Sequence, residues 1–166
     1  MAASGSSATP SPRYDPLGRI AGVLGHRSPA ALASTFVKDV LLAADADWVI
    51  EEVAAALLGD DITVRLVRAG ADVRGAVAVQ TPDLVILDLQ IGNMGGMATA
   101  IDLRHESLAG RLEHVPVLML LDREADVFLA KRSNADAWLV KPIDSFGLRR
   151  SVDSLLAEAA SAGQGG

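Results

Sequence analysis

Short apolar runs alternate along the chain with segments of helical spacing from about residue 36 onward. Five of these runs have the length and apolar content of β-strands, at 36–45, 62–67, 84–88, 115–121 and 137–140. The run at 62–67 alternates polar and apolar residues, whereas the others are almost continuously apolar. Continuous apolar strands are typical of a sheet that is covered on both faces.

The segments between and after these strands have the spacing of amphipathic helices, at 48–59, 71–79, 97–105, 123–132 and from about Asp144. The first should end at Gly59, and the second is weakened by an internal glycine. The last carries one apolar side, formed by Leu148, Val152, Leu155, Leu156 and Ala159. Strands that alternate with helices in this way predict a doubly wound α/β fold, in which helices cover both faces of a parallel sheet.

The two ends of the chain differ from this regular part. Residues 1–16 are rich in Ser, Ala and Pro and have little to bury, so we predict a mostly disordered N-terminal arm over 1–35. Ser28 as N-cap and Pro29 at the first helical position are compatible with a short helix over 29–35. The folded domain is predicted over 36–160, followed by a flexible tail over 161–166.

Composition excludes several classes of function. The 166 residues are 50% hydrophobic, which is enough for one domain core, and they contain no cysteine for disulfides or thiolate metal sites. A net charge of −6 argues against nucleic-acid binding. The chain has no apolar run long enough to span a membrane and no signal-peptide pattern, so we expect a cytoplasmic protein that does not insert into a membrane.

Polar side chains stand where three of the predicted strands end: Asp45, Asp88 and Lys141. In open parallel sheets, ligands bind beyond the carboxyl ends of the strands. Two carboxylates can hold Mg²⁺, one of them can also serve as a nucleophile toward a phosphoryl group, and a lysine can contact phosphate oxygens. A single aspartate at a strand end more often caps a turn, and that alternative stays open for each residue taken alone.

Four segments resemble the receiver domain of bacterial response regulators: "VLLAADAD", "PDLVILDLQIGNMGG", "VPVLMLL" and "NADAWLVKP". The resemblance implies a flavodoxin-like (βα)5 fold with strand order 2-1-3-4-5. It also implies that Asp88 is the phosphoacceptor of a histidine kinase or phosphotransfer protein and that Lys141 contacts the phosphoryl group. Asp45, Asp88 and the backbone carbonyl of Gln90 would bind Mg²⁺. The peptide bond before Pro142 would be cis.

The chain departs from the family at positions that affect signalling. Ala44 stands where the family has a second acid, so Mg²⁺ binding is expected to be weak. Leu121 replaces the hydroxyl residue that contacts the phosphoryl group, and a leucine has no donor. Trp138 occupies the aromatic switch position, and its bulk disfavours an inward movement.

Two hypotheses of function follow. In the first, the chain is a stand-alone atypical response regulator that is phosphorylated on Asp88 and signals by protein–protein contact, without being an enzyme. In the second, it is a phosphorylation-independent pseudo-receiver that serves as an interaction module or accessory subunit of a larger complex. Partners would bind the face over 124–158 and also the arm over 1–35. A hydrolase is disfavoured because Asp122 is only a remote candidate for a second general acid near Asp88.

Overall fold

The computed structural model describes residues 36–163. The predicted arm, the short helix considered over 29–35 and the last three residues of the predicted tail lie outside this part of the chain. Within residues 36–163, no helix is both long and apolar enough to cross a membrane.

One parallel sheet of five strands forms the centre of the domain, in the order β2-β1-β3-β4-β5. This confirms the predicted fold class and strand order. The strands, which are numbered along the chain, are β1 (Lys38–Ala43), β2 (Ile62–Val67), β3 (Leu84–Asp88), β4 (Val117–Leu121) and β5 (Ala137–Val140).

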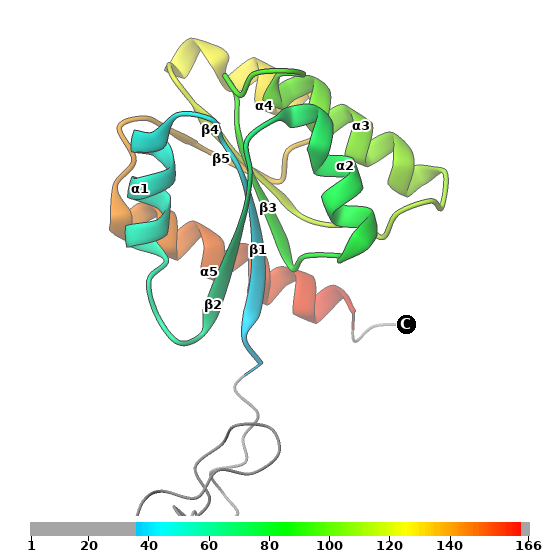
Figure 1. Ribbon diagram of the computed structural model, residues 1–166, viewed down its shortest axis with the longest axis horizontal. Helices are drawn as coiled ribbons and strands as arrows, with labels where there is room; N and C mark the ends of the chain where they lie inside the picture. Colours follow the sequence, from blue (N-terminus) through cyan, green and yellow to red (C-terminus); the bar gives the residue numbers. More distant parts are fainter. Residues whose placement is uncertain (1–35, 164–166) are drawn as a thin grey trace, which may run out of the picture. The chain divides into compact units, whose positions relative to one another are not determined.

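Helices cover both faces of the sheet (Figure 1). One face carries α1 (Asp47–Ala56) and α5 (Ser145–Ala162), which pack against each other. The other face carries α2 (Gly70–Val79), α3 (Gly96–Leu108) and α4 (Val127–Arg132). A 3₁₀ turn, η2 (Glu124–Asp126), precedes α4.

The side chains of each strand divide between two apolar cores, because successive residues of a strand point to opposite faces. In β3, Leu84 and Ile86 join the core under α1 and α5, whereas Val85 and Leu87 join the core under α2, α3 and α4. Every residue of β3 and β4 is buried. This double coverage explains why these two strands are continuously apolar in the sequence.

Several element boundaries differ from the sequence prediction: β1 and β4 each begin two residues later than predicted, and α3 spans Gly96–Leu108 instead of 97–105. Helix α1 ends at Ala56, before the predicted stop at Gly59, and Leu57 closes it while lying in the core. The predicted helix over 123–132 is a 3₁₀ turn followed by a short α-helix. Helix α5 continues to Ala162, two residues into the predicted tail.

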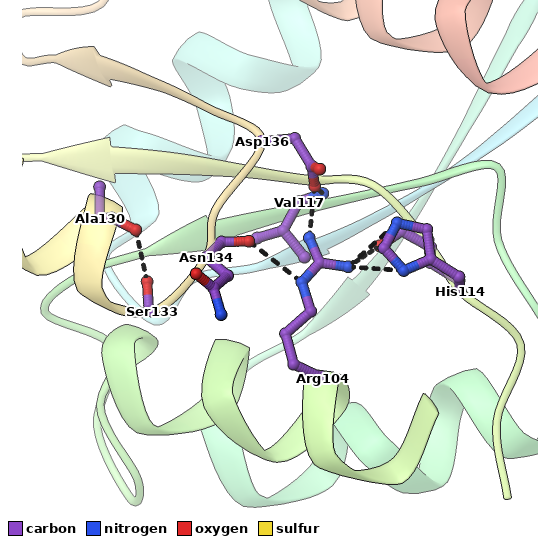
Figure 2. A network of polar contacts seen from close by, with 8 residues as sticks. Arg104, His114, Val117, Ala130, Ser133, Asn134 and Asp136 are labelled. Carbon is purple, nitrogen blue, oxygen red and sulfur yellow. Dashed lines mark hydrogen bonds and ion pairs between the residues drawn. The ribbon is translucent and has the colours of Figure 1, made fainter. Parts of the chain in front are cut away.

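A buried arginine connects α3 to the amino-terminal ends of β4 and β5 (Figure 2). Arg104 is paired with Asp136 and donates to the carbonyls of Asn134 at 3.0 Å and Val115 at 2.9 Å. Asp136 also accepts from the backbone N–H of Val117 at 2.6 Å. The network fixes the start of β5 beside β4, and β5 in turn determines where Lys141 lies.

Candidate functional site

Four charged side chains gather at the carboxyl edge of the sheet. Asp88 is the last residue of β3, Asp122 follows β4 directly, Lys141 follows β5 directly, and Asp45 lies two residues beyond β1. The register places Ala43 of β1 beside Leu87 of β3, so Asp45 and Asp88 leave the sheet at nearly the same level. The parallel topology therefore brings together residues that are far apart in the sequence.

Asp88 is almost fully buried, with its side chain 2% exposed. Its Oδ1 accepts from Lys141 Nζ at 2.7 Å and from the backbone N–H of Gln90 at 3.1 Å. A buried carboxylate needs such partners to keep its charge. No residue of 36–163 donates a hydrogen bond to the second oxygen, Oδ2. This oxygen is also not one of the fully buried polar atoms that lack a partner. Within residues 36–163, Oδ2 is thus the oxygen of Asp88 that has no protein partner.

Lys141 reaches Asp88 across the end of β4 and is itself 7% exposed. Its backbone N–H donates to the carbonyl of Leu121 at 2.8 Å, which fixes where the side chain starts. The ammonium also donates to Asp122 Oδ1 at 3.1 Å and lies 5.3 Å from the centre of the Trp48 ring. The Lys141–Pro142 peptide bond is cis, as the resemblance implied.

The loop after Asp88 is anchored to the start of α2. The backbone N–H groups of Gly70 and Ala71 donate to the carbonyls of Gly92 and Asn93, at 3.1 and 2.8 Å. Asn93 adopts a left-handed conformation with φ of 51°, which asparagine tolerates better than most residues. The hydrogen bonds to α2 thus hold the loop in a shape that a free chain would rarely adopt.

Asp45 is exposed and faces this loop, with its Oδ2 accepting from the N–H of Gly92 at 3.0 Å. A side chain at position 92 would approach the carboxylate, since an added Cβ would lie 3.0 Å from the same oxygen. Asp47, the next acid along the chain, is paired with Arg68 at 2.8 Å. Asp45 is therefore the acid of this segment that contacts the loop after Asp88.

The site offers oxygen donors of the kind that Mg²⁺ accepts. Asp45 and Asp88 supply two carboxylates and Gln90 a backbone carbonyl, and Mg²⁺ accepts such hard ligands while keeping several waters. No group of three or more His, Cys, Asp or Glu side chains within residues 36–163 is arranged to hold a metal ion. Ala44, which is fully buried, adds no oxygen. The donor atoms are of the kind that Mg²⁺ prefers, but only two of them carry a negative charge.

The two expected switch positions lie on the α2–α3–α4 side of the sheet. Leu121 is fully buried in that core and Trp138 packs against the same core, partly exposed. Lys131 lies over the Trp138 ring, 5.6 Å from its centre. Leu121 presents no polar atom to Asp88, and Trp138 acts as a packing residue with a cationic neighbour.

Two glycines of α2 give a matched test of how the loop is anchored. A Cβ at Gly70 would lie 1.7 Å from the carbonyl oxygen of Met94, whereas one at Gly75 would meet no atom within 4 Å. We expect Gly75→Ala to stabilise the domain by about 0.5–1 kcal/mol and Gly70→Ala to destabilise it by about 1–3 kcal/mol. Urea unfolding of both variants checks this, and equal effects would contradict the tight contact.

The family model of the response regulator receiver domain matches residues 40–153. The chain therefore belongs to the response regulator receiver domain family. Receiver domains bind Mg²⁺ at their phosphorylation site and interact with histidine kinases or phosphotransfer proteins. The match includes β1 from Val40 onward, the other four strands in full and most of the helical layers described above.

Curated relatives come from bacteria and are longer proteins. The chain is 31% identical over 118 residues to the response regulator protein PmrA of Pseudomonas aeruginosa, covering 70% of this chain and 51% of that protein. It is 29% identical over 128 residues to the transcriptional regulatory protein CseB of Streptomyces coelicolor, covering 76% of this chain and 52% of that protein. The chain thus spans about half the length of these relatives.

Solved structures show the same fold. The signal receiver domain of a signal transduction histidine kinase from Syntrophus aciditrophicus has a TM-score of 0.65 at 24% identity, covering 73% of this chain and 91% of that chain. The chemotaxis response regulator CheY4 of Vibrio cholerae has a TM-score of 0.63 at 21% identity, covering 72% and 98%. At these identities the likeness supports the architecture alone.

Two contacts of Lys141 were missed by the sequence prediction. Asp122 was considered only as a remote candidate for a second general acid, and its contact with Lys141 was not foreseen, yet both carboxylates bind one ammonium. Trp48 was not considered, although its ring lies over that ammonium. One signal was available for Asp122, because it follows the strand next to β3 and must reach the same edge of the sheet.

Proposed function

We propose that this receiver domain acts in the cytoplasm as a response regulator that accepts a phosphoryl group on Asp88 and signals through protein–protein contact. The observation that carries the proposal is the pairing of buried Asp88 with Lys141 beneath a loop that leaves Oδ2 without a protein partner among residues 36–163. A stand-alone organisation and the absence of enzymatic activity, both expected from the sequence, stay predictions.

The proposed reaction transfers a phosphoryl group from an oxygen or nitrogen atom of the donor to an oxygen of Asp88. Oδ2 of Asp88 forms a bond to the phosphorus of the donor, and the bond from phosphorus to the donor atom breaks, with its electron pair leaving on the donor. Lys141 neutralises charge on Asp88 and lies within reach of the phosphoryl oxygens. Mg²⁺, bound by Asp45, Asp88 and the Gln90 carbonyl, would supply charge neutralisation for the incoming group.

The proposal is tested by intact mass measurement after incubation with acetyl phosphate and Mg²⁺. We expect a single phosphoryl adduct on the wild type, none on Asp88→Asn, and an unchanged adduct on Asp72→Asn, which removes an exposed acid of α2. Chelation of Mg²⁺ should abolish the adduct. An adduct that persists on Asp88→Asn would place the acceptor elsewhere, and no adduct on folded wild type would refute phosphotransfer.

A second function is favoured by Leu121. This side chain is fully buried where a hydroxyl would contact the phosphoryl group, so the domain lacks one donor that would couple phosphorylation to its surface. The observation supports a pseudo-receiver that binds its partner regardless of phosphorylation, serving as an accessory subunit of a larger complex. A partner that binds wild type treated with acetyl phosphate and Mg²⁺ with the same affinity as Asp88→Asn would decide for this function.

A further inference from the structure

The ammonium of Lys141 is shared by two carboxylates that belong to different strand ends. Asp88 Oδ1 lies 2.7 Å from Nζ and Asp122 Oδ1 lies 3.1 Å from it. Since both oxygens contact one nitrogen, they lie within about 6 Å of each other, where like charges repel appreciably. One positive charge thus holds two negative ones at the phosphoacceptor.

Among residues 36–163, Lys141 is the side chain that pairs with Asp122. Its Oδ2 is sealed from solvent and, within residues 36–163, has no hydrogen-bond partner. Leaving a buried carboxylate oxygen unpaired is unfavourable. The ion pair with Lys141 is therefore the contact that keeps this carboxylate turned inward, and Lys141 contacts Asp88 and Asp122 at the same time.

We propose that Asp122 is a positioning residue that divides Lys141 between two carboxylates, and thereby favours a cation and disfavours an anion at Asp88. The proposal rests on the function proposed above, because it concerns the ligands of the same carboxylate. The negative charge of Asp122 attracts Mg²⁺ to the neighbouring carboxylate of Asp88. The same charge repels a phosphoryl group on Asp88. It also pairs with Lys141, so that less of the positive charge of Lys141 is available to neutralise the phosphoryl group.

Replacing this charge should move the two affinities in opposite directions. Asp122→Asn keeps the shape of the side chain and removes its charge, so Lys141 becomes fully available to Asp88. A cation then finds less negative charge, and an anion finds more positive charge. A side chain with a merely structural role would not produce this pattern, because loosening the site weakens both ligands together.

Trp48 provides the signal for these measurements. Its ring centre lies 5.3 Å from Lys141 Nζ, and the residue is 49% exposed. The emission of an indole depends on charges beside it, so displacement of the ammonium should change it. Trp138 is the second of the two tryptophans of the chain, and Trp138→Phe leaves Trp48 as the sole source of emission.

The experiment is a fluorescence titration of the full-length chain carrying Trp138→Phe, with and without Asp122→Asn. Mg²⁺ alone is the cation. Trifluoroberyllate at saturating Mg²⁺ is the anion, since it coordinates a carboxylate oxygen and has the tetrahedral shape of a phosphoryl group. Glu124→Gln is the matched control, because it removes an exposed acid two residues further along the chain.

For Asp122→Asn we expect Mg²⁺ to bind roughly fivefold more weakly and trifluoroberyllate roughly fivefold more tightly, because one charge about 6 Å away is lost. Glu124→Gln should change neither affinity by more than about twofold. Weakening of both ligands, or no change in either, would overturn the proposal. The emission of the ligand-free protein gives an independent reading, in which Asp122→Asn should differ from wild type and Glu124→Gln should not.

The emission of the ligand-free protein distinguishes a failure of the phosphoacceptor function from a failure of the proposed role of Asp122. If wild type binds neither ligand, the phosphoacceptor function fails. A changed ligand-free emission in Asp122→Asn would then still support the positioning of Lys141. An unchanged emission would overturn that positioning as well.

Discussion

Replacing Arg104 with methionine is expected to destabilise the domain by about 2–3 kcal/mol, less than the cost of breaking a fully buried ion pair because Asp136 is 33% exposed and partly screened by solvent. The guanidinium is 10% exposed, and it satisfies Asp136 as well as two backbone carbonyls. Methionine fills much of the volume but donates no hydrogen bond. The carboxylate of Asp136 and both carbonyls would lose their buried donor (Figure 2).

Urea unfolding followed by circular dichroism measures this loss. Arg74→Met is the matched control, because Arg74 also pairs with acids but is 56% exposed, and exposed pairs contribute at most about 1 kcal/mol. We expect the control to stay within about 1 kcal/mol of wild type. An equally small effect of Arg104→Met would show that the network does not hold α3 to β4 and β5.

The second large effect is expected from Lys141→Met. The side chains of Lys141 and Asp88 are 7% and 2% exposed, so the substitution leaves a buried carboxylate without its cation. We expect a loss of about 3 kcal/mol in the absence of divalent ions, the lower end of what breaking a buried pair costs. Asp122, which is 34% exposed, adds to the uncompensated charge but is partly screened by solvent.

Magnesium should restore part of this stability. Without the ammonium, the oxygens of Asp45 and Asp88 attract a divalent cation more strongly, and a ligand that binds the folded state stabilises it by mass action. Thermal unfolding with Mg²⁺ and with chelator measures the difference. Lys131→Met is the control, since this exposed lysine lies over Trp138 rather than at the acids. If Mg²⁺ stabilised Lys141→Met no more than wild type, the ammonium and the metal would not share this site.

Most of the architecture was predictable because it depends on local patterns. Apolar runs of strand length alternate with helical spacing, and the chain order of the elements leaves few arrangements of a parallel sheet. The prediction of element ends was weaker. Helix α1 stops at Ala56 because Leu57 turns into the core, and not at the glycine that marks a helix end in isolation.

The candidate site was predictable only in part. Asp45, Asp88 and Lys141 were identified from their places at strand ends and from the family resemblance, and the structure brings Asp88 and Lys141 into direct contact. The roles of Asp122 and Trp48 were missed because each depends on the direction of a side chain across neighbouring elements. The spacing of residues along the sequence does not predict in which direction these two side chains point.

The sequence by itself determined the order of strands and helices, the two-sided burial of the sheet and the set of acids and lysine at its carboxyl edge. These follow from short-range spacing and from the rule that parallel strands end on one side. Only the tertiary structure decided that Lys141 is divided between Asp88 and Asp122 and that Asp47 is paired with Arg68. An ion pair forms where folded elements bring charges within a few ångströms, and sequence distance does not limit which charges meet.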